Sequence, residues 1–165
     1  MTDLLFLDFE TRSTIDLRAT GVDAYAKHPT TDIWCIAWSW REMDDVTTPQ
    51  DVDDVVLKWV REGKPVVAHN MAFELAIWNL IGVPRFGWPE LKPEQCIDTM
   101  AMAYAMALPG ALDDAAKAVG LDVQKDAAGH RLMLQMSRPR KIQPDGTIIW
   151  WDSQEKRDAL FAYCV

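Results

Sequence analysis

Short strand-like segments alternate with helix-like segments along most of the chain, and this order constrains the fold class. LLFLDFE (4–10) and IWCIAWSW (33–40) come first, and their length and their aromatic and β-branched residues predict buried strands. A weaker strand is predicted near DVTT (45–48). Further strands are predicted at 65–69 and 96–99, each followed by a segment with helical spacing. The order predicts an α/β structure with a mixed sheet.

Helices are predicted where apolar residues recur at helical spacing between capping, Gly or Pro residues. The predicted helices lie around 21–29, 51–63, 70–82, 100–108, 110–120 and 126–137, and from 152 to the end. The last of them begins with Asp152 and Glu155, a capping-box pattern. The segment PRKIQPDGT (139–147) is predicted to be a loop.

Composition indicates one globular domain, residues 1–165, with 49% apolar residues and enough chain for a single core. No apolar run is long enough to span a membrane, and the N-terminus lacks the pattern of a secretory signal. Cys35, Cys96 and Cys164 are far apart among apolar residues, which predicts buried thiols in a reducing cytoplasm. The net charge of −8 argues against a protein that binds nucleic acid by general electrostatic attraction. It does not argue against an enzyme whose carboxylates bind phosphate through metal ions.

The first strand ends in two acids, Asp8 and Glu10, separated by Phe9. The alternation of side chains along a strand places both carboxylates on one face. Two adjacent buried carboxylates repel each other, so a cation is expected between them. The alternative is that one of these acids caps a turn or pairs with Arg12.

A second polar group lies in HNMAFELAIWN (69–79), where a strand gives way to a helix. Asn70 and Glu74 are four residues apart, so both side chains can face one point. The alternative is that Asn70 caps the helix and Glu74 is a solvated acid.

For other polar residues, the sequence alone predicts structural roles rather than catalytic ones. Tyr163 has apolar neighbours and is expected to lie in the core with its hydroxyl at the boundary. Asp98 is expected to be the N-cap of the helix that follows it. The basic segment SRPRK (137–141) is expected to be a solvated face, with phosphate binding as the alternative.

Taken together, these motifs resemble the DEDD superfamily of exonucleases. The resemblance is to the 3′–5′ proofreading domain of phage-type family A DNA polymerases, the type with a tyrosine in its third motif. Asp-x-Glu at 8–10 matches the first motif, and Thr11 matches the threonine that often follows. Asn70 to Glu74 matches the second motif in its HN-x-x-FE version. The resemblance covers nearly the whole chain and implies an RNase H-like mixed sheet flanked by helices.

One departure concerns the third motif, Tyr-x-x-x-Asp, which Tyr163 begins. Its acid would fall two positions past Val165, and Asp158 is on a different helical face and is a poor substitute. The expectation is an N-terminal fragment of a longer polymerase, with weak or no nuclease activity by itself. In a phage-encoded protein the location would be the cytoplasm of the bacterial host.

The resemblance implies hydrolysis assisted by two divalent ions, Mg²⁺ or Mn²⁺. In that scheme Asp8 bridges both ions, Glu10 holds the ion that binds the attacking water, and Glu74 supports the second ion. Tyr163 would orient the water and Asn70 would contact the terminal nucleotide. Asp8, Glu10, Glu74 and Tyr163 are thus the predicted catalytic residues.

The implied substrate is a frayed single-stranded DNA 3′ end, and the implied partner is the polymerase domain of the same parent chain. The candidate substrate-binding residues are Phe9, Thr11, Asn70, Met71 and Phe73. The aromatic and Met side chains among them would stack on the bases or wedge between them. Phe9, Met71 and Phe73 can equally be core residues. Two other functions stay open: a catalytically silent module that binds DNA or another polymerase part, and an RNase of the same superfamily.

Overall fold

A five-stranded mixed sheet organises the computed structural model, which describes residues 3–121 and 126–164. Its spatial order is β3-β2-β1-β4-β5, with β1 antiparallel to β2 and parallel to β4. The strands are β1 (Leu5–Arg12), β2 (Asp32–Trp40), β3 (Met43–Thr47), β4 (Val66–Ala68) and β5 (Cys96–Asp98). The predicted α/β class with a mixed sheet is confirmed, including the weak third strand, and the arrangement is compatible with an RNase H-like fold.

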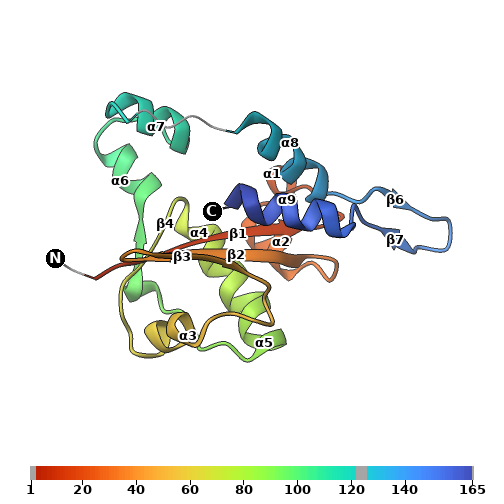
Figure 1. Ribbon diagram of the computed structural model, residues 1–165, viewed down its shortest axis with the longest axis horizontal. Helices are drawn as coiled ribbons and strands as arrows, with labels where there is room; N and C mark the ends of the chain where they lie inside the picture. Colours follow the sequence, from red (N-terminus) through yellow and green to blue (C-terminus); the bar gives the residue numbers. More distant parts are fainter. Residues whose placement is uncertain (1–2, 122–125, 165) are drawn as a thin grey trace.

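Helices cover both faces of this sheet (Figure 1). They are α1 (Leu17–Thr20), α2 (Val22–Lys27), α3 (Asp54–Arg61), α4 (Met71–Ile77), the π-helix η1 (Trp78–Gly82), α5 (Val83–Phe86), the 3₁₀ helix η2 (Pro93–Gln95), α6 (Thr99–Ala105), α7 (Leu112–Ala118), α8 (Ala127–Met136) and α9 (Gln154–Cys164). In Figure 1, α3 and α5 lie on one side of the sheet and α9 lies on the other. None of the helices in the described ranges is both long and apolar enough to cross a membrane.

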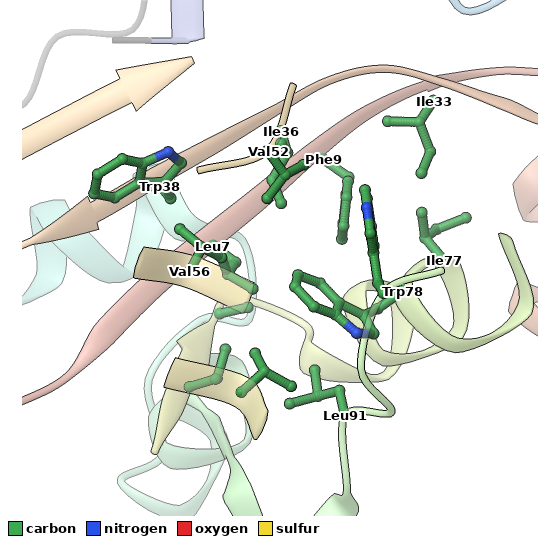
Figure 2. Packing of buried hydrophobic residues seen from close by; sticks show 14 of the residues in the cluster. Leu7, Phe9, Ile33, Ile36, Trp38, Val52, Val56, Ile77, Trp78 and Leu91 are labelled. Carbon is green, nitrogen blue, oxygen red and sulfur yellow. The ribbon is translucent and has the colours of Figure 1, made fainter. Parts of the chain in front are cut away.

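Strand β1 is central because its two faces have different chemistry. Leu5, Leu7 and Phe9 alternate with Phe6 and Asp8, and the first three are at most 4% exposed. They pack into the main core, together with residues of α3, α4 and η1. Figure 2 shows Phe9 pointing into this cluster toward the ring of Trp78, whose centroid lies 6.4 Å away. Burial of this apolar face fixes the direction of the acids on the other face.

A smaller core forms on the opposite face, where α8 and α9 pack on β2. It contains Trp34, Cys35, Met136 and Leu160, all buried. The indole Nε1–H of Trp34 donates a hydrogen bond to the carbonyl oxygen of Met136 at 3.0 Å. This cluster brings the end of the chain over the acidic face of β1.

Several local expectations need correction. The predicted helix 70–82 is α4 followed by a π-helical turn, and the predicted loop 139–147 contains a small hairpin, β6 (Lys141–Ile142) and β7 (Ile148–Ile149). Asp152 does not cap α9, because its carboxylate is paired with Arg157, while the Oγ of Ser153 accepts from the Lys156 N–H at 3.4 Å. The predicted helix 110–120 is confirmed as α7 over Leu112–Ala118.

Two apolar residues three positions apart, Ile77 on α4 and Leu80 on η1, differ in their contribution to the main core. Ile77 is fully buried, whereas Leu80 is 38% exposed. Ile77→Ala should lower the free energy of unfolding by about 2–5 kcal/mol, because it opens a cavity in the main core. Leu80→Ala is the matched control and should lower it by less than about 1 kcal/mol. Urea unfolding measures both, and equal losses would contradict this account of the core.

Candidate functional site

Three acids meet where β1 and α4 approach each other. Asp8 and Glu10 project from the same face of β1, and Glu74 lies one turn into α4. Their environments differ: the Asp8 side chain reaches solvent, Glu10 is half-buried, and Glu74 is only 3% exposed. The charge of Asp8 acts on both glutamates. The structure therefore brings the three predicted acids into one electrostatic cluster.

Burial changes the ionisation of this acid cluster. Desolvation, with a smaller contribution from the charge of Asp8, raises the pKa of Glu10 to about 9 and that of Glu74 to about 8. Desolvation also raises the pKa of Asp8, and the nearby His69 opposes that shift. Desolvation is therefore the main cause of the raised pKa at all three acids.

Neighbouring cations do not neutralise these acids. Within residues 3–121 and 126–164, no lysine or arginine forms an ion pair with Asp8, Glu10 or Glu74. Arg12, the partner considered from the sequence, instead binds Asp32 at 2.9 Å between its Nη2 and the Oδ2. The reading of Asp8 or Glu10 as a partner of Arg12 is therefore wrong.

Glu74 is the most informative of the three acids. Its Oε2 is buried and has no hydrogen-bond partner. A buried carboxylate oxygen without a partner is unfavourable by several kcal/mol unless it is protonated or bound to a cation. The reading of Glu74 as a solvated surface acid is therefore wrong, and its free oxygen fits a ligand for a hard cation.

Small residues on β2 leave room above the acids of β1. Asp8 is paired in register with Ala37, and Glu10 with Cys35. A register shift follows directly between Glu10 and Thr11, the kind of bulge that redirects side chains near functional sites. A cavity of about 300 Å³ opens over this part of the sheet and is lined by Asp8, Ala37 and Cys164 among others.

Asn70 has an uncommon backbone conformation, with φ 73° and ψ 51°. Asparagine tolerates this left-handed region better than most residues. Its N–H donates to the Oδ1 of Asp98 at 3.1 Å, and its side chain makes no capping hydrogen bond. The reading of Asn70 as a side-chain cap is therefore wrong. Asp98 does cap α6, as predicted, by accepting from the N–H groups of Met100 and Ala101.

His69 belongs to this site although sequence reasoning did not select it. Its Nδ1 lies 3.0 Å from the Oγ1 of Thr99, and its Nε2 lies 2.7 Å from the carbonyl oxygen of Gly110. These contacts hold the ring close enough to Asp8 to influence its pKa. The sequence signal that could have identified His69 is its position directly before Asn70, at the start of the HN-x-x-FE version of the second motif.

Tyr163 reaches the site from α9, on the opposite side of the sheet from α4. It is half-buried, and burial together with the charge of Glu10 raises the pKa of its hydroxyl. Its ring lies against the backbone of α8: a Cβ added to Gly129 would fall 2.1 Å from the ring Cδ2 of Tyr163. Gly129 therefore permits the close approach that brings Tyr163 toward Glu10, and sequence reasoning did not select it.

A cleft of about 480 Å³, here called the Glu10 cleft, begins at the acid cluster. Its lining joins strand β1 to helices α1, α2, α4 and α8, and comprises Phe9, Glu10, Thr11, Ile15, Asp16, Leu17, Arg18, Tyr25, Phe73, His130, Met133, Leu134, Ser137 and Arg138. Glu10 supplies an acid, and Arg18 and Arg138 supply cations. Arg138, from the basic segment 137–141, also contacts Asp16 at 3.3 Å through its Nη2.

The candidate substrate-binding residues have different surroundings. Phe9 and Met71 are 4% and 3% exposed and lie in the main core, so in this structure neither ring nor thioether is free to stack on a base. Thr11 is also buried, and its hydroxyl lies 2.9 Å from that of Tyr25. Phe73 is half-buried and lines the Glu10 cleft. The core reading therefore holds for Phe9 and Met71.

The acid cluster is an incomplete ligand set as it stands. No group of three or more His, Cys, Asp or Glu side chains in the described part of the chain is arranged to hold a metal ion. The orphaned oxygen of Glu74 and the acids that lack cation partners nevertheless have the chemistry that Mg²⁺ and Mn²⁺ prefer. The donor atoms therefore suit a divalent cation by their chemistry, while their arrangement in the described residues does not form a three-ligand site.

Ionisation of the buried acids predicts how stability depends on pH in the metal-free chain. Between about pH 5 and pH 8, Glu74 holds a proton in the folded chain but not in the unfolded chain, where its pKa is 4.5. The free energy of unfolding should therefore fall as pH rises through this range. Glu74→Gln removes this proton uptake, so its stability relative to the parent chain should increase by on the order of 3 kcal/mol from pH 5 to pH 8. Urea unfolding at the two pH values measures the difference.

Glu62→Gln is the control for this experiment. Glu62 is exposed to solvent, and its hydrogen bond to Lys64 lowers its pKa. The variant should keep the parent's fall in stability between pH 5 and pH 8. The account of Glu74 fails if Glu74→Gln also keeps the parent's pH dependence.

Comparison with known proteins shows similarity between the chain and part of a phage DNA polymerase. No protein-family model matches it. It is 32% identical to the DNA polymerase of Bacillus phage SP02 in an alignment 146 positions long that covers 83% of this chain. The matched region is 21% of that polymerase, so the chain spans about a fifth of the length of this curated relative. The similarity supports a polymerase-related domain.

Proposed function

We propose that this chain is the 3′–5′ proofreading exonuclease domain of a DNA polymerase. It would hydrolyse the terminal phosphodiester at single-stranded DNA 3′ ends and release deoxynucleoside monophosphates. The observation that carries the proposal is that Asp8 acts electrostatically on both Glu10 of β1 and the buried, unpartnered Glu74 of α4. Similarity to part of a phage DNA polymerase supports it.

Asp8, Glu10 and Glu74 would hold two divalent ions, Mg²⁺ or Mn²⁺. When bound, such ions supply an activated water and stabilise charge on the leaving 3′ oxygen. Glu10 and Glu74 must lose the protons that burial favours before they can act as ligands. Metal binding is therefore expected to release protons and to strengthen as pH rises.

The other residues of the site would position the substrate. The Tyr163 hydroxyl, on the Glu10 side of the site, would orient the attacking water. Asn70, held at the start of α4 by Asp98, would contact the terminal nucleotide. The preceding nucleotides would follow the Glu10 cleft, where Phe73 offers a ring and Arg138 offers a charge to a phosphate.

This arrangement suits an unpaired end better than a duplex. The chain carries a net charge of −8, so attraction for DNA comes from local cations and from bound metal rather than from the whole surface. A mismatched terminus frays more readily than a matched one and would reach the acids more often. The preference for mismatched ends would therefore come from the fraying of the DNA end itself.

The first test is metal binding by the 165-residue chain. Mn²⁺ at a hundred times its Kd should stabilise the folded chain by about 2.7 kcal/mol. Glu10→Gln should lose most of this gain, because it removes a charged ligand. Asp23→Asn is the control: Asp23 is exposed and pairs with Lys27 on α2, away from the acid cluster, so its variant should respond as the parent does. Thermal unfolding with and without Mn²⁺ at pH 8 measures the effect, and an unchanged response in Glu10→Gln would refute the metal site.

We propose that this chain forms part of a longer polymerase, and the second test measures nuclease activity in that protein. Asp8→Ala should reduce metal-dependent release of nucleotides from a labelled single strand by on the order of a thousandfold or more, because metal catalysis supplies several kcal/mol. Asp23→Ala should keep the parental rate.

A silent binding module is the second candidate, and the incomplete ligand set of the described residues favours it. Binding of a short oligonucleotide with Mn²⁺ but without cleavage, in the longer polymerase itself, would support that module and refute the exonuclease. Rates on RNA and DNA of matched sequence would identify an RNase.

A further inference from the structure

Two thiols lie close together behind the acid cluster, and the proposed chemistry uses neither. The Sγ atoms of Cys35 and Cys164 are 3.9 Å apart, although the residues are 129 positions apart in the sequence. Cys35 is on β2 and fully buried, whereas Cys164 is half-buried at the end of α9. Both are free thiols.

The two thiols belong to elements that already pack together. Both lie in the second core cluster with Leu160 and Met136, which hold α9 and α8 against β2. A disulfide bond has its sulfurs about 2.05 Å apart, so the two atoms must approach by about 2 Å. Cys96 has a different setting, since its thiol donates to the carbonyl oxygen of Lys92 at 3.4 Å.

Cys164 is also accessible to small reagents. It lines the 300 Å³ cavity over the sheet, together with Asp8, Asp44 and Asp45. These acids repel anionic reagents and attract cationic ones. A small cationic disulfide is therefore the reagent that this cavity favours.

We propose that Cys35 and Cys164 form an oxidisable dithiol that reacts with low-molecular-weight disulfides and ties the end of α9 to β2. The Cys164 thiol loses its proton, and its sulfur attacks the reagent, breaking the S–S bond and releasing one thiol that takes the proton. The Cys35 sulfur then attacks the Cys164 sulfur and releases the second thiol in the same way. The two protein thiols lose two electrons, and one disulfide is reduced to two thiols.

The cross-link lies next to two residues of the candidate site. Cys35 is paired in register with Glu10 on β1, and Cys164 directly follows Tyr163. Oxidation would draw the last turn of α9 toward β2 and change the position of Tyr163 relative to Glu10. Formation of the bond itself needs no nuclease activity, so it can be tested separately from the proposed function.

The experiment treats the Cys96→Ser variant with cystamine, a cationic disulfide. This variant keeps only Cys35 and Cys164. Its intact mass should fall by two hydrogens without a retained adduct, and reductant should restore it. The melting temperature should rise on the order of 10 °C, because the bond closes a loop of more than a hundred residues. Oxidised glutathione, which is anionic, should react about tenfold more slowly.

Cys164→Ser provides the matched comparison. Treatment with cystamine should neither lower its mass by two hydrogens nor raise its melting temperature. The proposal is overturned if the Cys96→Ser variant retains two titratable thiols after treatment. It is equally overturned if that variant accumulates only a cystamine adduct on Cys164, because the Cys35 sulfur has then failed to reach its partner.

Discussion

The rest of the site depends on acids of β1 and α4 that lie close together with no partner lysine or arginine in the part of the chain that the structure describes. Pairing with arginine offsets part of the cost of withdrawing an acid from water, as at the half-buried Asp32, which pairs with Arg12 one strand away. The acid cluster has no such partner among the described residues. Glu10 and Glu74 are instead left with pKa values near 9 and 8. Such a cluster is unfavourable for the metal-free fold, which is typical of sites arranged for binding rather than for stability.

The fold supports this cluster by using one strand for two purposes. Every second residue of β1 enters the main core, and burial of Leu7 and Phe9 sets the direction of Asp8 and Glu10. A slip of one residue in register would reverse both faces, so the apolar core also secures the acid site. On β2, the partner of Asp8 is Ala37, whose small side chain leaves space above the sheet.

Sequence reasoning succeeded where local periodicity decides the outcome. Alternation along β1 placed Asp8 and Glu10 on one face, and the capping role of Asp98 followed from its position before a helix. It did not decide whether Glu74 is solvated or buried, because helical spacing shows which face of a helix a residue lies on but not what packs against that face. The close approach of Tyr163 to Gly129 and the contact of Cys35 with Cys164 join elements far apart in the chain. No local pattern encodes such contacts, so only the tertiary structure reveals them.

Protons and divalent ions compete for the same oxygens in this cluster. Near neutral pH the metal-free fold keeps protons on Glu10 and Glu74, which removes most of the repulsion with Asp8. A bound cation would replace those protons and neutralise the same charges, so the fold has two ways to relieve one repulsion. The buried oxygen of Glu74 distinguishes the two, because a proton leaves it without a partner, whereas a cation ligated by several oxygens would give it one. A bound cation would thus relieve both the repulsion between the acids and the lack of a partner for the Glu74 oxygen, and this would link the instability of the metal-free cluster to the proposed function.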